Sequence, residues 1–344
     1  MIGKQQTENL RRELQKKKLD ALLLINYSSD HIDKSFQYFT GIEWVEHSYA
    51  IITKDSEKLY LPKFEINRCE TETWIKNIEE LPKKKSFETI IGTLKKKKIG
   101  INGEFLTANT FQKLKAKKIT DLSAEIRKLR IIKTKEEIEL LRQAIRITEK
   151  FYHNINFSGT EMEIAADIQD RASRSGAKLA FDSIVAFDGN SALPHAKVTN
   201  GKGSRVLLID SGAAYKGYHA DVTRTFPVRE DKEFEKIYGI VLDIQERAIN
   251  MVSPGVKASA IDKFVRGELK RKGFEFIHST GHGIGLEIHE APAISEKSKD
   301  ILKENMVHTI EPGIYLKGKF GIRIEDDVLV TRNGYEVLTK GIGK

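Results

Sequence analysis

The sequence has almost no cysteine and no long apolar run. Cys69 is the only cysteine among 344 residues, which excludes a disulfide framework and is typical of a reducing cytoplasm. We expect Cys69 to be an ordinary structural thiol and not a nucleophile. No apolar stretch reaches the roughly 20 residues of a membrane-spanning helix, and the first residues lack the pattern of a secretion signal. We therefore expect a cytoplasmic protein with no membrane partner.

Positive charge exceeds negative charge, with a formal net charge of +9. Runs of lysine at residues 16–18, 83–85 and 95–98 account for part of this excess. Such runs can follow a phosphate backbone, but these lack interleaved aromatic residues. We interpret them as solvated faces, so the charge does not point to nucleic acid as a partner.

The length allows two domains. The first 122 residues alternate between helical and strand patterns, which predicts an α/β domain at 1–122. Its helices are expected at 7–18 and 108–117, and its strands at 21–25, 49–53, 58–61 and 99–101.

From residue 123 the pattern changes, and we place a second domain at 123–344. Ile138, Leu141, Ile145 and Tyr152 fall on one face of a helix over 136–152. Thr160 and Glu163 form a capping box that opens a second helix. Further helices are expected at 233–251 and 260–272. Together with strand-like segments, they indicate the α+β class.

Four acidic residues and one histidine in this second domain have the character of metal ligands: Asp210, Asp221, His282, Glu311 and Glu325. Each acid is embedded in apolar, β-branched sequence, where an unpaired charge is costly to bury. Core acids paired with lysine or arginine are the alternative interpretation. An oxygen-rich set with one imidazole favours Mn, Co, Fe or Zn over ions that prefer thiolate ligands.

The spacing of these acids supports the metal interpretation. A hairpin centred between Tyr215 and Lys216 places Asp210 directly opposite Asp221. A second hairpin, centred on Gly318, places Glu311 opposite Glu325, although Pro312 and Gly313 are expected to distort the pairing. Like charges opposite each other destabilise a sheet, so two such pairs predict a bound cation.

At these residues the chain resembles the pita-bread metallopeptidases, in the branch of Xaa-Pro aminopeptidase (aminopeptidase P) and Xaa-Pro dipeptidase (prolidase). Methionine aminopeptidase is a more distant relative and lacks the N-terminal domain. The matching segments are 191–196, 210–225, 281–290, 309–315 and 321–330. The resemblance implies a creatinase-type α/β domain at 1–122 and a pita-bread catalytic domain at 123–344, in which helices back a curved antiparallel sheet.

The resemblance also implies a mechanism. Two divalent ions, Mn first and otherwise Co, Zn or Fe, would activate a bridging hydroxide that attacks the Xaa-Pro bond of a peptide or dipeptide. Asp221 and Glu325 would bridge the ions. Asp210 would complete the shell of one ion, and His282 and Glu311 that of the other. Glu311 would also carry the proton to the leaving nitrogen.

Other residues are expected to take supporting roles. By the same resemblance, His195, His278 and His289 would line the pocket and contribute to catalysis. Arg323 lies two residues before Glu325 and should point the same way along a strand, where it would orient the bridging carboxylate or bind a substrate carboxylate. Thr223 would form a hydrogen bond in the Asp221 shell. A homodimer is also implied.

Some questions stay open at the sequence level. The sequence does not separate aminopeptidase P from a strict dipeptidase. It assigns no role to His308, where relatives commonly carry an aromatic residue, or to Trp44 and His47 in the N-terminal domain. A catalytically inactive pita-bread module that binds peptide or nucleic acid is the alternative function, but the five intact ligand positions oppose it. The same ligand set weakens a creatinase-like hydrolase.

Overall fold

The computed structural model describes residues 2–344 and divides into two compact units that meet in sequence between Arg130 and Ile131. The boundary that we expect after residue 122 falls at the start of α6 (Ser123–Ile131), a helix that lies almost wholly in the first unit. Within residues 2–344, no helix is both long and apolar enough to cross a bilayer.

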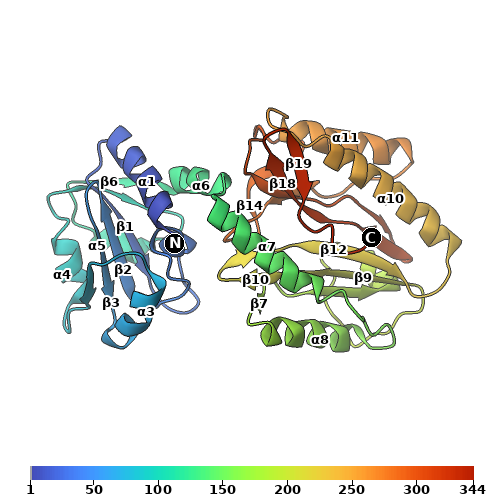
Figure 1. Ribbon diagram of the computed structural model, residues 1–344, viewed down its shortest axis with the longest axis horizontal. Coiled ribbons are helices and arrows are strands. Elements are labelled where there is room, and N and C mark those ends of the chain that lie inside the picture. Colours follow the sequence, from blue (N-terminus) through green and yellow to red (C-terminus); the bar gives the residue numbers. More distant parts are fainter. Residues whose placement is uncertain (1) are drawn as a thin grey trace. The chain divides into compact units, whose positions relative to one another are not determined.

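The first unit is an α/β domain in which helices surround a sheet (Figure 1). The sheet is mixed, and its strand order is β4-β3-β2-β1-β5-β6. The central strand β1 is buried along its whole length and pairs antiparallel with β2 and parallel with β5. The strands are β1 (Ala21–Asn26), β2 (Ser48–Thr53), β3 (Glu57–Leu61), β4 (Ile78–Glu80), β5 (Lys98–Ile101) and β6 (Lys118–Asp121). The helices are α1 (Lys4–Lys16), α2 (Lys34–Thr40), α3 (Ile66–Glu72), α4 (Ser86–Gly92) and α5 (Ala108–Lys113), with a 3-10 turn at Lys63–Glu65.

The four strands and two helices predicted for this unit are all present. The shortest elements, such as β4 and α4, escaped prediction because they contain too few residues to show a periodic pattern.

The second unit is an α+β domain in which every strand pair is antiparallel. Its first half contains α7 (Lys135–Glu149), α8 (Glu161–Arg174), β7 (Lys178–Leu179), β8 (Ile184–Phe187), α9 (Asp188–Ser191), β9 (Val206–Ser211), β10 (Ala213–Tyr215), β11 (Tyr218–His219) and β12 (Val222–Pro227). Its second half contains α10 (Lys232–Asn250), α11 (Ala258–Arg271), β13 (Gly281–Gly283), β14 (Glu290–Ile294), β15 (Val307–Ile310), β16 (Gly313–Leu316), β17 (Phe320–Arg323), β18 (Asp326–Thr331) and β19 (Gly334–Val337).

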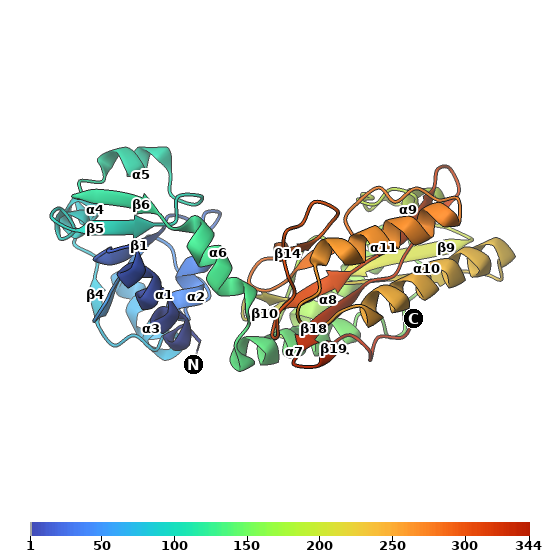
Figure 2. The same ribbon diagram turned by 90° about the horizontal axis from the view of Figure 1, so that it is seen from above.

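A pair of helices covers each half of this unit (Figures 1 and 2). Apolar residues of α7 and α8 pack against β8 and β9, and those of α10 and α11 pack against β15 to β18. The capping boxes that begin α7 and α8 form at Thr134 and Thr160, the latter as predicted. The expected pita-bread arrangement of helices backing antiparallel strands is therefore confirmed.

The register of the first acidic hairpin differs from our prediction by two residues. Asp210 lies opposite Thr223, not opposite Asp221. The turn is centred between Lys216 and Gly217, which have φ of 47° and 79°. A two-residue turn of this kind needs positive φ at both positions, and glycine supplies it without strain. Because the shift is even, both acids remain on one face of the hairpin.

The register of the second acidic hairpin is confirmed. Gly313 pairs with Arg323 around a turn at Gly318, which has φ of 75°. The same register continues beyond the interruption at Pro312, where Ile310 pairs with Asp326. Glu311 and Glu325 thus occupy opposite positions in a gap between two paired segments of the hairpin. Both side chains reach the same cavity from this gap.

In the first acidic hairpin, the backbone at Gly212 packs closely against the backbone at Ala220. A Cβ atom built there would lie 1.7 Å from the carbonyl oxygen of Ala220. We expect Gly212→Ala to lower the free energy of unfolding by about 1–3 kcal/mol or more, since backbone cannot yield as a side chain can. Gly239→Ala is the matched control, because Gly239 lies exposed in α10 with nothing within 4 Å of its Cβ position. It should stabilise the chain by about 0.5–1 kcal/mol. Urea denaturation measures both changes, and equal effects would contradict the steric argument.

Candidate metal centre

One cavity of about 460 Å³ gathers the predicted site residues of the second unit. Its wall contains all five predicted ligands together with the three predicted histidines and Arg323: Asp210, Asp221, His282, Glu311, Glu325, His195, His278, His289 and Arg323. Thr223 lies behind this wall and bonds to two of its members. The structure therefore brings together every residue that the sequence nominated for the site.

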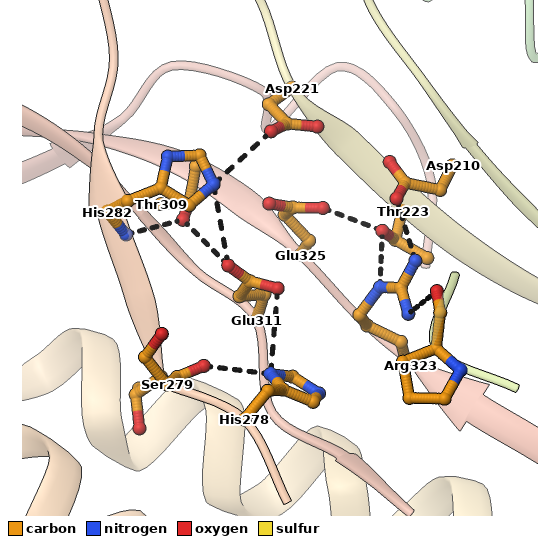
Figure 3. Close-up of polar contacts among 12 residues, drawn as sticks. Asp210, Asp221, Thr223, His278, Ser279, His282, Thr309, Glu311, Arg323 and Glu325 are labelled. Atoms are coloured by element: carbon orange, nitrogen blue, oxygen red, sulfur yellow. Dashed lines mark hydrogen bonds and ion pairs between the residues drawn. The ribbon is translucent and has the colours of Figure 1, made fainter. Parts of the chain in front are cut away.

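The four acidic ligands lie at or beside the ends of strands, and His282 is the middle residue of β13. Asp210 is near the end of β9, Asp221 directly precedes β12, and Glu325 directly precedes β18. Figure 3 shows the carboxylates of Asp221, Glu311 and Glu325 and the ring of His282 turned toward a common space. The Nε2 atom of His282 lies 3.5 Å from Asp221 Oδ2 and 3.5 Å from Glu311 Oε1.

Glycines on both sides of His282 allow this approach. A Cβ atom at Gly281 would lie 2.1 Å from the carbonyl oxygen of Thr309, and one at Gly283 would lie 2.2 Å from that of Ala291. Strand β13 is therefore pressed between β14 and β15, and the His282 side chain projects from it into the cavity.

The electrostatics of this cluster call for a cation. Burial, and then the neighbouring carboxylates, raise the pKa of Asp221 and that of Glu325 well above their usual ranges. Burial also raises the pKa of Glu311 to about 7. Burial lowers the pKa of His282 to about 4, so its imidazole is neutral near pH 7 and can act as a ligand.

The donor atoms fit divalent metal ions. One ligand atom each of Asp221, His282 and Glu325 lie within 4.8 Å of one another. The Oδ1 atoms of Asp210 and Asp221 are buried without a hydrogen-bond partner within the described residues. Buried charged oxygens without partners are costly unless they coordinate a metal. Oxygen ligands with one imidazole suit Mn, Co, Fe or Zn.

Arg323 and Thr223 link Asp210 to Glu325. The guanidinium donates a 2.7 Å bond to Asp210 Oδ2 and a 3.0 Å bond to Thr223 Oγ1. The Thr223 hydroxyl donates to Glu325 Oε2 at 2.6 Å. Thr223 thus bonds to Glu325 and not to Asp221 itself. The backbone explains this contact, because the N–H of Glu325 donates to the carbonyl oxygen of Thr223 at 3.1 Å.

Tyr315 is a site residue that sequence reasoning missed. Its hydroxyl accepts a 2.8 Å bond from Arg323 and lies 2.8 Å from His278 Nε2. His278 Nδ1 lies 2.8 Å from the carbonyl oxygen of Ser279, so Nδ1 carries the proton and Nε2 accepts from Tyr315. Burial lowers the pKa of His278 to about 4, which keeps it neutral. The Thr309–Tyr315 match contained this tyrosine, but nothing in the sequence showed the contact.

The loop that carries His195 is held by Glu161, the first residue of α8. This buried carboxylate accepts bonds from the backbone N–H groups of Phe187 and Thr199 and from the amide of Asn190. Glu161 lies between the two capping-box residues Thr160 and Glu163, and nothing in the sequence indicated this role. His195 itself is exposed and lines the cavity.

His289 stands beside His282, and their ring centroids are 4.3 Å apart in an edge-on arrangement. Burial lowers the pKa of His289. His308 is fully buried on β15 with Nδ1 near the carbonyl oxygen of Thr309, and it does not line the cavity. In the first unit, Trp44 is 40% exposed under the guanidinium of Arg68, and His47 is exposed.

Two family models match the chain and together span most of it. The model described as "Metallopeptidase family M24" matches residues 139–332. The model described as "Creatinase/Prolidase N-terminal domain" matches residues 6–132.

Individual relatives match over nearly their whole length. The chain is 39% identical to an Xaa-Pro dipeptidase of Pyrococcus furiosus over 88% of this chain and 90% of that protein. It is 35% identical to an Xaa-Pro dipeptidase of Pyrococcus horikoshii over 95% and 94%. Among solved structures, an X-Pro aminopeptidase of Thermotoga maritima superposes with a TM-score of 0.89 at 35% identity, covering 95% of this chain and 97% of that one.

Glu311 should make the metal-free protein less stable as pH rises from about 4.5 to about 7. In this range the folded carboxyl, with a pKa of about 7, keeps a proton that the unfolded chain has already lost. Folding then takes up a proton, so the free energy of unfolding falls with pH, by up to about 3 kcal/mol at about 1.4 kcal/mol per pKa unit.

The measurement is urea denaturation with a chelator present, from about pH 5 to about pH 8. Wild type is compared with Glu311→Gln, and the difference between them isolates this residue. The comparison is needed because the buried histidines, whose pKa values are lowered, contribute the opposite slope. A difference that does not change with pH would contradict the assignment.

Divalent metal should stabilise the second unit. At an ion concentration about 100 times the dissociation constant, the gain is about 2.7 kcal/mol, or roughly 5–10 °C in melting temperature. Asp221→Asn and Glu325→Gln should abolish most of the shift, while the exposed Glu296→Gln should keep it. Calorimetry with and without Mn²⁺ measures this, and a shift of equal size in all four proteins would place the ion elsewhere.

Proposed function

Because the chain belongs to metallopeptidase family M24 and carries the creatinase/prolidase N-terminal domain, we propose that it is a metal-dependent exopeptidase for Xaa-Pro bonds. The bond cleaved lies at the N-terminus of a peptide or within a dipeptide. The observation that carries this proposal is the single cavity in which five potential ligands meet three histidines and an arginine. The names of the relatives, dipeptidases and an aminopeptidase, support the substrate class.

We propose that Asp210, Asp221, His282, Glu311 and Glu325 hold two divalent ions, with Asp221 and Glu325 shared between them. Burial and neighbouring carboxylates, which raise the pKa of Asp221 and that of Glu325, together with the raised pKa of Glu311, support this assignment. When bound, such ions lower the pKa of water and polarise a peptide carbonyl. Mn²⁺ is our first choice among the ions that this donor set suits.

Glu311 is the residue that moves the proton in this proposal. Its carboxylate faces the cavity beside His282, and Thr309 Oγ1 holds Oε1 at 3.3 Å. The nitrogen of an Xaa-Pro bond carries no hydrogen, so it must gain a proton to leave as an amine. In this proposal Glu311 accepts a proton from the attacking water and then donates it to the leaving nitrogen.

The histidines divide into two kinds. His195 and His289 are exposed to the cavity and can donate hydrogen bonds to substrate oxygens as charge develops there. Both ring nitrogens of His278 are already engaged, by Ser279 and Tyr315. We therefore assign His278 to positioning: together with Tyr315 it braces Arg323 against Asp210.

The rest of the cavity wall suits a proline ring. Phe181, Ile184, Pro194 and Ile288 supply apolar surface within the same cavity as the ligands. An apolar wall of this kind binds a ring without needing an N–H donor from the substrate backbone. In this proposal the free α-amine of the substrate lies toward the carboxylates, which restricts cleavage to the first bond.

We further propose that the enzyme is a cytoplasmic homodimer. A single cysteine that is buried and unpaired supports a reducing compartment. The homodimer is implied by the family resemblance.

Hydrolysis of Gly-Pro and Ala-Pro, compared with Ala-Pro-Xaa tripeptides and Gly-Leu, tests the proposal. Chelation should abolish cleavage of the Xaa-Pro substrates and Mn²⁺ should restore it, while Gly-Leu stays intact. Glu311→Ala should lower kcat by about 10²–10⁴-fold, the range of a lost acid–base group. Cleavage of dipeptides alone identifies a dipeptidase, and cleavage of tripeptides as well identifies an aminopeptidase.

The exposed Glu296→Gln serves as the control variant for this assay. No cleavage by folded protein with Mn, Co, Zn or Fe would overturn the enzyme proposal. That outcome would favour a pita-bread module that only binds its peptide.

A further inference from the structure

Lys133 is a lysine buried in the second unit, outside the ligand cluster. Its side chain is 1% exposed and ranks among the largest fully buried side chains of the described residues. Its Nζ lies 3.0 Å from Glu290 Oε2, and the Glu290 side chain is 6% exposed. A lysine is almost never buried to this extent unless it is paired.

Glu290 ends the loop that carries His289. This loop, residues 284–289, joins β13, which bears His282, to β14, which begins at Glu290. The second carboxylate oxygen of Glu290 accepts a 3.1 Å bond from the backbone N–H of Glu287. A Cβ atom at Gly285 would lie 2.7 Å from Glu290 Oε2, so the carboxylate lies directly over the loop backbone. The Glu290 carboxylate therefore contacts the loop backbone at both Gly285 and Glu287.

Lys133 is itself fixed from several sides. Its backbone N–H donates to the carbonyl oxygen of Asn305 at 2.8 Å. It directly precedes Thr134, the residue that caps α7. Nearby, buried Glu137 accepts bonds from the Thr134 N–H and the Tyr218 hydroxyl. The start of α7 therefore fixes the position of Lys133, and its ammonium group contacts the loop through the ion pair with Glu290.

The loop places two side chains on the cavity wall, those of Ile288 and His289. His289 in turn packs against the ligand His282, with ring centroids 4.3 Å apart. A second tie fixes the other end of the loop, where His219 binds the carbonyl oxygen of Gly285 through its backbone N–H and lies 3.0 Å from it through Nδ1. His289 thus lies between two fixed points of the loop, the hydrogen bonds of His219 to Gly285 and the ion pair of Lys133 with Glu290.

We propose that Lys133 is a positioning residue of the active site: through its buried ion pair with Glu290 it fixes the 284–289 loop and so the place of His289. This inference rests on the proposed function and deepens it. A buried ion pair contributes little net stability compared with apolar residues of the same shape. Ile284 and Leu286 anchor the first part of the loop by their burial, whereas Glu287 and His289 are exposed, so the ion pair constrains the exposed end that carries His289.

A double-mutant cycle in the full-length chain tests the proposal. The variants are Lys133→Met, Glu290→Gln and the double variant, with Lys135→Met as the matched control because Lys135 is exposed two residues away. Two readouts use metal-free protein: hydrogen–deuterium exchange of the 284–290 backbone, and the pH titration of the His289 ring by NMR. A third readout is kcat and KM on Ala-Pro with Mn²⁺ added.

We expect each single variant to speed exchange in 284–290 and to shift the His289 titration, while exchange in α8 stays at its wild-type rate. We expect kcat to fall roughly 10- to 100-fold, the range found when residues supporting a metal site are lost, with less change in KM. The double variant should lose less than the sum of the single variants. Lys135→Met should match wild type in every readout.

Faster exchange throughout the second unit, or an unchanged His289 titration, would show that Lys133 only stabilises the fold, and would overturn the proposal. If Lys133→Met does not fold, Glu290→Gln decides the matter, because it keeps the shape of the side chain and removes only its charge. If wild type cleaves no Xaa-Pro peptide, the proposed function fails, but the exchange and NMR readouts still test the positioning role.

Discussion

The arrangement of the second unit depends on mutual repulsion among buried carboxylates. Asp210, Asp221, Glu311 and Glu325 line one cavity, and burial together with their neighbours raises the pKa of Asp221 and that of Glu325. Such a cluster is unfavourable in any fold that does not compensate it. Short strands, glycines that allow close backbone approach and hydrogen-bonded loops are what keep these side chains together. The unfavourable free energy of burying these carboxylates is offset only if the site binds a cation.

Backbone geometry decides how closely the acids approach. Two hairpins deliver them, and each hairpin is fixed by a turn that needs positive φ, at Lys216–Gly217 and at Gly318. In the second hairpin the ladder opens around Pro312 and then resumes in the same register, which releases Glu311 and Glu325 into the cavity. The fold therefore uses interruptions of its sheets as ligand positions, because a side chain at an interruption can leave the plane of its neighbours.

Features set by local sequence patterns were predicted more completely than contacts between residues that are distant in sequence. The Gly318 hairpin was predictable because a single glycine marks its centre. The first hairpin was placed two residues out of register because the Lys216–Gly217 turn was not identified, although an even shift kept both acids on one face. Tyr315, Glu161 and Lys133 were invisible as site residues, since their partners His278, Phe187 and Glu290 lie 26 or more residues away in sequence and only the folded chain brings them together.

The charge balance of the cavity sets a limit on what it can hold. Among the described residues that line it, Arg323 is the only lysine or arginine, although the chain as a whole carries a net charge of +9. Five ionised carboxylates, those of the four acidic ligands and of the exposed Asp182, and one guanidinium sum to −4. One divalent ion would leave −2 and two would give 0, so two ions bring the cavity to neutrality. Without a cation the charged carboxylates are unfavourable in this buried site, and the raised pKa values of Asp221, Glu311 and Glu325 express that cost. Arg323 pairs directly with Asp210, and its charge also opposes the rise in the pKa of Glu311 and in that of Glu325. One guanidinium still leaves most of the negative charge of the cavity to be compensated by metal.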